Sequence, residues 1–349
     1  MNIRKLVREN ILRLKPYSSA RGKYLNGILL DANENAIGSV IDQRGELNLN
    51  RYPDPNHNEV KEKLSKYINI PNENLFIGVG SDEIIDLLVR IFCNPSVDNC
   101  IINEPTYGMY KVVCDINDVE CKSVLLTENF QLDLEKIKSV IDEKTKIIFI
   151  CSPNNPTANL LKKDHILNLA KKTDTVVVVD EAYVDFSSQT SLMYESLNHE
   201  NLVVMRTFSK AWGLAGIRAG YCTASKEITE ILYKIKAPYN LNSLTSQSII
   251  SAIDLSGLKD KFVNDILIER ERVENELKNI NGIKQVFESE TNYLFFFFYN
   301  AKGVYNKLAE KGVIIRDRSN QPLLENCLRV SIGTKDHNDK FLKELREVL

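Results

Sequence analysis

One lysine of this chain stands among residues that suit covalent chemistry with an aldehyde. The run at 206–221 reads RTFSKAWGLAGIRAGY, and it places Ser209 directly before Lys210 and Arg218 eight residues after it. A hydroxyl and a guanidinium together can hold a phosphate, and the glycines between them let the backbone come close to a ligand. This spacing suits a lysine that forms a Schiff base with a phosphorylated aldehyde.

A carboxylate thirty residues upstream suits the other end of such an aldehyde. Asp180 follows four consecutive valines, which is typical of the end of a buried strand, and Tyr183 comes three residues later. Pyridoxal phosphate (PLP) needs an amine at its aldehyde carbon and an anion at its ring nitrogen, so Lys210 and Asp180 together indicate this cofactor. An anionic Asp180 would keep that nitrogen protonated, and Tyr183 could donate to the phenolate oxygen. Taken alone, Asp180 could equally be a solvated carboxylate at the end of a strand.

Two weaker motifs would serve the same ligand. The run GVGSDE at 78–83 closes an expected strand and opens a helix whose free amides attract phosphate, although Gly-x-Gly before a helix is more often only a turn. The run CSPNNPT at 151–157 is either a turn that ends a strand or a loop from which Asn155 donates to a cofactor oxygen. A single lysine is normally a surface residue, but the four motifs in this order favour a functional Lys210.

Such residues can act together only if the fold brings their strands side by side. Through the middle of the chain, short apolar runs alternate with helical patterns, which predicts parallel βαβ units with helices on both faces of a sheet. The carboxyl ends of parallel strands meet at one edge, and the four motifs follow such ends. The fold class is therefore α/β with a mostly parallel central sheet. The expected strands are 75–79, 146–151, 176–179 and 202–205, and the expected helices are 81–92, 161–171 and 226–236.

The last third of the chain has a different pattern, which indicates a smaller α+β domain. Helices are expected at 245–254, 258–280 and 336–349, and strands at 293–299, 313–315 and 328–332. The 349 residues also exceed the size at which a single core stops growing. The expected division is an N-terminal arm of residues 1–30, a large cofactor-binding domain of residues 31–244 and a small domain of residues 245–349.

Composition argues against several other classes of protein. Lysine and arginine number 45 against 47 acidic residues, for a net charge of −2, so no excess of positive charge favours nucleic acid. No run approaches the roughly 18 apolar residues of a membrane span, and the first residues lack the apolar core of a signal peptide. Seven scattered cysteines without a C-x-x-C pair and four distant histidines predict neither a metal site nor a disulfide framework. We expect free thiols in a reducing cytoplasm.

The four motifs in this order resemble the fold-type-I PLP-dependent aminotransferases, and the resemblance covers nearly the whole chain. Further signatures are similar to the histidinol-phosphate aminotransferase branch: PY at 16–17, LDANEN at 30–35, RYPDP at 51–55, PTYGMY at 105–110, PYNLN at 238–242, RD at 316–317 and LRV at 328–330. The resemblance to this branch implies transfer of an amino group from L-histidinol phosphate to 2-oxoglutarate, giving 3-(imidazol-4-yl)-2-oxopropyl phosphate and L-glutamate, in histidine biosynthesis.

The resemblance also implies which residues hold and use the cofactor. Lys210 would form the covalent link and then move a proton between the substrate Cα and the cofactor C4′, while Asp180 pairs with the ring nitrogen and Tyr107 stacks on the ring. The phenolate oxygen would contact Tyr183 and Asn155. The cofactor phosphate would contact Ser81, Asp82, Ser209, Arg218 and, from a partner subunit, Tyr52. This shared site implies a homodimer.

Substrate recognition depends on a phosphate, since histidinol phosphate carries one where other amino donors carry a carboxylate. The resemblance implies that Arg316 and Arg329 lie near it, with Asn155 and with Tyr17 of the N-terminal arm. Arginine suits this role because its planar fork binds phosphate bidentately. Surface salt bridges are the alternative for both arginines.

Some residues depart from the family pattern. Ala36, Ala158 and Trp212 stand where the family usually has proline, glycine and phenylalanine. None of them removes a reactive group, and we expect Ala158 to tighten the loop beside Asn155. Four consecutive phenylalanines at 295–298 have no functional interpretation beyond core packing.

Other functions fit parts of the sequence. An aromatic amino-acid aminotransferase would keep the fold and the cofactor, because a site for imidazole can admit a phenyl ring. A PLP lyase that decarboxylates threonine phosphate shares most motifs, so product analysis would separate it. A transcription regulator would need a helix-turn-helix domain of about sixty residues before Asp31, and only about thirty precede it. A catalytically dead module would be expected to lose Lys210 or Asp180, and both are present.

Overall fold

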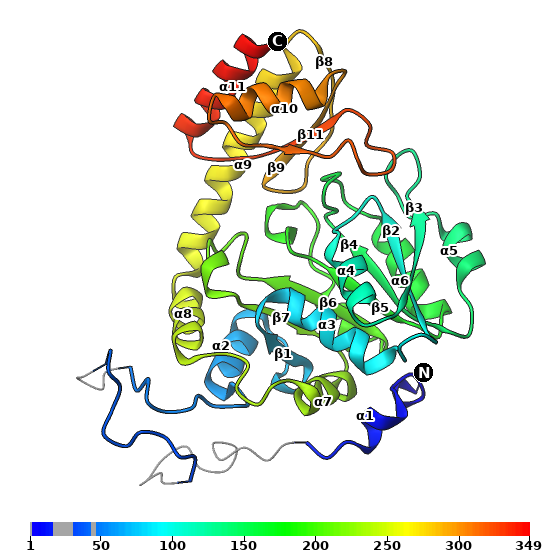
Figure 1. The fold of residues 1–349 in the computed structure, drawn as a ribbon, viewed down its shortest axis with the longest axis vertical. Helices are drawn as coiled ribbons and strands as arrows, with labels where there is room; N and C mark the ends of the chain where they lie inside the picture. The colour runs from blue at the N-terminus through cyan, green and yellow to red at the C-terminus, as the bar shows by residue number, and fades with distance from the viewer. Residues whose placement is uncertain (1, 17–30, 43–46) are drawn as a thin grey trace.

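The computed structural model describes residues 2–16, 31–42 and 47–349, and its largest element is a seven-stranded sheet (Figure 1). The strand order is β1-β7-β6-β5-β4-β2-β3; β7 runs antiparallel to both of its neighbours, and the pairs from β6 to β3 are parallel. The predicted α/β class with a mostly parallel sheet is confirmed. The strands are β1 (Leu75–Gly78), β2 (Asn99–Glu104), β3 (Glu120–Leu125), β4 (Thr145–Cys151), β5 (Val176–Asp180), β6 (Leu202–Thr207) and β7 (Gly220–Thr223).

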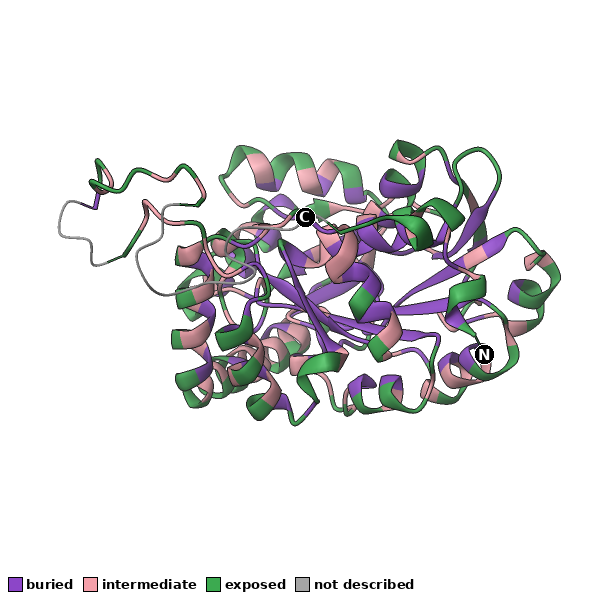
Figure 2. Ribbon diagram, turned by 90° about the horizontal axis from the view of Figure 1, so that it is seen from below, coloured by how far each residue is buried: buried purple, intermediate pink, exposed green. Residues whose placement is uncertain are grey.

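Alternation along the strands explains why helices cover both faces of this sheet. In β5, Val176 and Val178 pack into one apolar cluster, Val177 and Val179 pack into another, and all four are fully buried. A strand that is apolar on both faces needs a cover on both, and Figure 2 shows the buried strands between helices with exposed outer sides. The first cluster contains residues of α3 (Gly80–Phe92), α4 (Met109–Ile116) and α7 (Lys226–Ile235). The second contains residues of α2 (Asn58–Ile68), α5 (Leu134–Val140), α6 (Lys163–Lys172) and α8 (Ser243–Asp254).

The expected strands and helices of this region are present, with ends shifted by at most two residues. The sequence patterns did not predict α2, α4, α5, β2, β3 or β7. Short helices complete this part of the described chain: α1 (Glu9–Arg13), η1 (Ile3–Lys5), η3 (Asn72–Asn74), η4 (Val184–Phe186), η5 (Met193–Leu197) and η6 (Ala215–Ile217).

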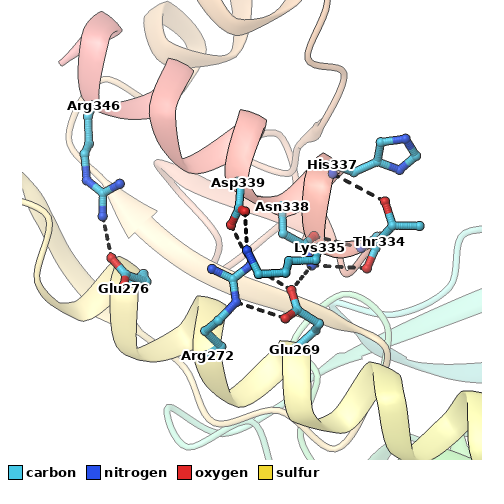
Figure 3. Close-up of polar contacts among 10 residues, drawn as sticks. Glu269, Arg272, Glu276, Thr334, Lys335, His337, Asn338, Asp339 and Arg346 are labelled. Atoms are coloured by element: carbon cyan, nitrogen blue, oxygen red, sulfur yellow. Dashed lines mark hydrogen bonds and ion pairs between the residues drawn. The ribbon is translucent and has the colours of Figure 1, made fainter.

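The C-terminal part forms a second, antiparallel sheet in the order β10-β11-β9-β8. Three helices accompany it, and in α9 and α11 the ion pairs of Arg272 with Asp339 and of Arg346 with Glu276 hold the two side by side (Figure 3). The elements are α9 (Ser256–Lys278), β8 (Ile283–Val286), β9 (Tyr293–Phe298), α10 (Ala301–Glu310), β10 (Arg316–Asp317), β11 (Cys327–Ser331) and α11 (Lys335–Val348). Helix α8, which contains the expected domain boundary, packs on the large sheet through Ile249 and Ile253.

The strand expected at 313–315 is wrong, because Val313 closes the turn that ends α10 and strand β10 begins only after Ile315. Gly312 has a left-handed φ of +76°, and the backbone N–H of Val313 donates to the carbonyl of Leu308. This pattern is a common helix stop. Strand pairing begins only at Arg316, the next residue after the apolar run.

The four consecutive phenylalanines serve two apolar clusters. Phe296 of β9 packs into the core between the small sheet and its helices, whereas Phe295 and its neighbour Tyr293 pack into a cluster with Tyr183 and Phe186 of the large sheet's loops. Successive residues of a strand face opposite sides, so the run joins the small sheet both to its own core and to the segment after β5.

Other classes of site find no support in the described residues. All seven cysteines are free thiols, and six of them are buried. Within residues 2–16, 31–42 and 47–349, no group of three or more histidine, cysteine or acidic side chains is arranged to hold a metal. No helix of the described chain is long and apolar enough to cross a membrane.

Candidate active site

A pocket of about 500 Å³ lies where the carboxyl ends of β4, β5 and β6 face the small sheet. The register pairs Cys151 at the end of β4 with Asp180 at the end of β5, so the motifs that follow these strands come together at one edge. Eleven of the thirteen candidate residues line this pocket: Ser81, Asp82, Tyr107, Asn155, Asp180, Tyr183, Ser209, Lys210, Arg218, Arg316 and Arg329.

Lys210 opens onto the pocket from the loop between β6 and η6. Its Nζ lies 5.5 Å from the centre of the Tyr183 ring. Partial burial lowers the pKa of Lys210, and the nearby Arg329 cation lowers it further, while Asp180 and Asp82 oppose the shift. The lowered pKa increases the fraction of neutral amine, which is the form that can attack a carbonyl or accept a proton.

Asp180 is a buried carboxylate at the end of β5, only 3% exposed. Its Oδ2 accepts a hydrogen bond from the Tyr110 hydroxyl at 2.9 Å, and its Oδ1 accepts one from the backbone N–H of Ala182 at 3.0 Å. Burial raises the pKa of Asp180 to about 6, although both hydrogen bonds favour the ionised form. A protonated ring nitrogen beside it would supply the cation that a buried carboxylate lacks.

Tyr110 is a site residue that the sequence did not assign. It lies on α4, is fully buried and stacks on Phe149 with ring centres 4.9 Å apart. The available signal was its place in the PTYGMY motif, three residues after Tyr107 and in the first turn of α4. Tyr107 contacts the Tyr110 ring edge-on and donates its hydroxyl to Asp82 Oδ1 at 3.1 Å.

A phosphate cradle is formed by the start of α3 and the segment before β7. Arg218 Nη2 lies 3.3 Å from Asp82 Oδ2, and Arg218 Nη1 donates to Ser209 Oγ at 3.4 Å. A Cβ on Gly220 would come within 2.6 Å of the Ser81 backbone nitrogen, so β7 can approach the first turn of α3 only as glycine. The free amides of that first turn, the Ser209 hydroxyl and the guanidinium fit a phosphate group.

The opposite end of the pocket is formed by the small sheet. Arg329 of β11 donates from Nη1 to Asn155 Oδ1 at 2.5 Å, and its guanidinium lies 5.0 Å from the centre of the Tyr293 ring. Arg316 of β10 is the register partner of Arg329. The pocket also contains Arg318 and Gln321, which the sequence did not single out. One sequence feature could have indicated Arg318: it lies two residues after Arg316, and residues two apart on an extended strand face the same side.

Of the two remaining candidate residues, the structure describes Tyr52. Tyr52 is 49% exposed and stacks on Tyr239, with ring centres 4.5 Å apart. Its own chain therefore does not bring it to the cofactor end, and its contact from a partner subunit stays a prediction. Tyr17 lies outside the residues that the structure describes.

The PYNLN motif at 238–242 stabilises the turn that carries Ser81 through a hydrogen bond to Glu83. Asn240 Nδ2 donates to Glu83 Oε2 at 2.9 Å, and the same carboxylate oxygen accepts the backbone N–H of Val79 at 2.6 Å. Glu83 thereby fixes the strand-to-helix turn that presents Ser81. Asn242 caps α8 by accepting the backbone N–H of Thr245 at 2.8 Å.

Comparison with known proteins identifies the family. Residues 23–345 match the family described as aminotransferase class I and II, to which this chain belongs. A histidinol-phosphate aminotransferase of Flavobacterium johnsoniae is 45% identical over 351 residues, with 99% of this chain and 98% of that protein covered. A relative of the same name from Cytophaga hutchinsonii is 44% identical over 343 residues, with 98% and 97% covered. The crystal structure of the histidinol-phosphate aminotransferase from Clostridium acetobutylicum is similar with a TM-score of 0.80 and 27% identity, over 88% of this chain and 94% of that one. These comparisons confirm the resemblance to the aminotransferase family and, within it, to the histidinol-phosphate aminotransferases.

Proposed function

We propose that this chain transfers the amino group of L-histidinol phosphate to 2-oxoglutarate, a step of histidine biosynthesis. The products are 3-(imidazol-4-yl)-2-oxopropyl phosphate and L-glutamate. The observation that carries this proposal is the layout of one pocket, with Lys210 and Asp180 at one end and a cluster of arginines at the other. The names of the full-length relatives support the same substrate.

The cofactor of the proposed reaction is pyridoxal 5′-phosphate, and the described residues fit it. The phosphate would be held by the first turn of α3 at Ser81 and Asp82, with Ser209 and Arg218. The close approach of Gly220 to the backbone of Ser81 keeps β7 packed against the first turn of α3, whose free amides would bind the phosphate. When bound, PLP supplies the electron sink for bonds broken at the substrate Cα.

Each of the main pocket residues has its own role in this proposal. Lys210 is the base at the substrate Cα, and its lowered pKa makes the neutral form available. Asp180 holds the ring nitrogen in its protonated state, Tyr183 and Asn155 orient the phenolate oxygen, and Tyr107 covers one face of the ring. Arg316 and Arg329 bind the substrate phosphate, and the contact between Arg329 and Asn155 couples the two ends of the site.

The proposal includes a homodimer with a shared site. Tyr52 would reach the cofactor phosphate of the partner subunit, and Tyr17 would contact the substrate phosphate. The exposure of Tyr52 in its own chain is consistent with such a contact. The chain would divide into an arm of residues 1–30, a cofactor-binding domain of residues 31–244 and a small domain of residues 245–349. A cytoplasmic location fits seven free thiols.

A single-turnover experiment tests the function. The protein loaded with PLP is mixed with L-histidinol phosphate, L-phenylalanine or O-phospho-L-threonine, and the absorbance of the bound cofactor is followed. The expected result is fast loss of absorbance with histidinol phosphate and much slower loss with the other two. Equal or faster change with phenylalanine would move the function to aromatic transamination, and release of carbon dioxide from phosphothreonine would make the protein a lyase.

A further inference from the structure

Three arginines of the small sheet share one face and one pocket. Arg316 and Arg329 are direct partners on β10 and β11, and the backbone N–H of Arg318 donates to the carbonyl of Cys327 at 2.9 Å, which extends the pairing past the end of β10. Residues two apart on an extended chain face the same side. All three side chains accordingly line the same pocket.

The protein itself does not balance these charges. Like charges directly opposite on neighbouring strands destabilise a sheet, yet no carboxylate of the described residues forms an ion pair with Arg316, Arg318 or Arg329 within 4.0 Å. The nearest acid in sequence, Asp317, instead accepts hydrogen bonds from the backbone N–H and the hydroxyl of Ser319, at 2.9 and 2.5 Å.

Arg318 is the least satisfied member of this cluster. Its Nε is buried without a hydrogen-bond partner among the described residues, and so is the Nε of Arg329, but Arg329 also donates to Asn155 through Nη1. Burial lowers the pKa of Arg318, and the two neighbouring guanidinium groups lower it further. A buried donor with no acceptor is unfavourable in the free protein, so the arrangement is explained if a ligand supplies the acceptor.

The number of donors indicates the ligand. A phosphate monoester offers three terminal oxygens and carries close to two negative charges near neutral pH, whereas a carboxylate offers two oxygens and one charge. Building on the function proposed above, we propose that Arg318 is a third phosphate-binding arginine, and that it makes the site prefer a phosphate dianion over a carboxylate. It is thus a specificity-determining residue for the phosphorylated amino donor.

Kinetics of two substrates give the first test. Arg318→Gln should lower kcat/KM for L-histidinol phosphate by about 10- to 100-fold, mostly through KM, because a hydrogen bond to a charged group is lost. The same variant should change kcat/KM for L-glutamate in the reverse direction by less than about threefold, since neither of its two carboxylates offers the three terminal oxygens of a phosphate. Arg318→Lys keeps the positive charge but not the planar guanidinium. Its kcat/KM for L-histidinol phosphate should lie between the values of the parent and of Arg318→Gln. Arg346→Gln, an exposed arginine of α11 outside the pocket, is the matched control and should behave as the parent.

Binding of a non-reacting phosphate ester gives a second readout, which a merely structural role would not move. Calorimetry of the PLP-loaded protein with 3-(imidazol-4-yl)propyl phosphate should show affinity rising with pH through about 6, where the ester loses its second proton. In Arg318→Gln this rise should be clearly smaller, while Arg346→Gln should keep it. The inference is overturned if the pH dependence is unchanged, or if both substrates weaken equally.

These results separate this inference from the proposed function. If the parent protein turns over histidinol phosphate and Arg318→Gln does so equally well, only the role of Arg318 is wrong. If the parent protein does not turn over histidinol phosphate, the proposed function fails, whatever the variants do. Cofactor absorbance of each variant checks that its site is assembled.

Discussion

The two ends of the active-site pocket differ in how their charges are balanced. At the end formed by the large sheet, Asp180 accepts two hydrogen bonds and Arg218 contacts both Asp82 and Ser209. At the end formed by the small sheet, Arg329 has a neutral amide as a partner of its Nη1, and Arg318 and Arg329 each carry a buried Nε with no partner among the described residues. At the first end the polar groups already have hydrogen-bond partners in the protein, although Asp180 still lacks a paired cation among the described residues. At the second end, donors of the arginines remain without acceptors in the part of the chain that the structure describes.

This difference matches what each end is proposed to bind. A resident cofactor benefits from groups that are already oriented, since no reorganisation is then needed during the reaction. A substrate must enter and leave in every cycle, so donors that remain unsatisfied until its phosphate arrives provide binding energy at the right moment. Variants at the two ends should therefore fail in different ways, through kcat at the large sheet and through KM at the small sheet.

The largest effect is expected at Lys210. Lys210→Ala should lower turnover by about 10⁴-fold or more, because it removes both the nucleophile and the base. The cofactor should still bind, since the cradle of Ser209 and Arg218 is intact, and its absorbance should be that of a non-covalent complex. Lys236→Ala is a suitable control, because burial also lowers the pKa of Lys236, to about 8, and it lies outside the pocket. Near-normal turnover in Lys210→Ala would sink the assignment.

Asp180→Asn should have the next largest effect. The amide cannot hold the ring nitrogen in its protonated state, so the single-turnover rate should fall by about 10²- to 10⁴-fold, the range for a group that controls a proton. KM for histidinol phosphate should change little, because the small sheet is untouched. An unchanged rate would remove Asp180 from its proposed role.

The same variant has a pH signature in the cofactor-free protein. Folding raises the pKa of Asp180 from 3.8 to about 6, so ionising it in the folded state costs about 3 kcal/mol. This cost is absent below pH 3.8, develops as the pH rises towards 6 and is fully present above it. Chemical denaturation should therefore show Asp180→Asn gaining stability relative to the parent between pH 4 and 7. Bound PLP should cancel or reverse the gain, and a pH-independent difference would contradict the raised pKa.

Arg329→Ala should test the other end of the comparison. KM for L-histidinol phosphate should rise about 10- to 100-fold, as expected for loss of a charge-assisted hydrogen bond, and far more than KM for L-phenylalanine. Arg316→Ala should have a smaller effect, because Arg316 is exposed and its charge is screened by solvent. Equal effects on both donors would mean that Arg329 binds an anion that they share.

The contrast between the two ends also explains what the sequence could predict. Continuous apolar runs such as the four valines before Asp180 identify buried strands, and motifs with several uncommon residues identify the cofactor end. Tyr110 and Arg318 were missed because a helical tyrosine and a loop arginine look ordinary until the fold brings Tyr110 to Asp180 and Arg318 to the pocket. The pattern was also insufficient for β3, an edge strand with the sequence ECKSVL, and for β10, which has two residues.

The smallest effect is expected at Ala158, in the loop that carries Asn155 between the two ends. Ala158 is fully buried and has a left-handed φ of +67°, which costs a residue with a side chain roughly 1–2 kcal/mol. Ala158→Gly relieves this strain, but it loses a buried methyl worth about 0.8 kcal/mol and makes the unfolded chain more flexible by about 0.5–1 kcal/mol. These terms nearly cancel, so stability should stay within about 1 kcal/mol of the parent.

Ala309→Gly in α10 is the control. It lacks the compensating relief of strain and should lose about 1 kcal/mol of stability. If Ala158→Gly instead lowers turnover with stability unchanged, the tight loop is what keeps Asn155 in contact with Arg329, and the two ends are coupled through it.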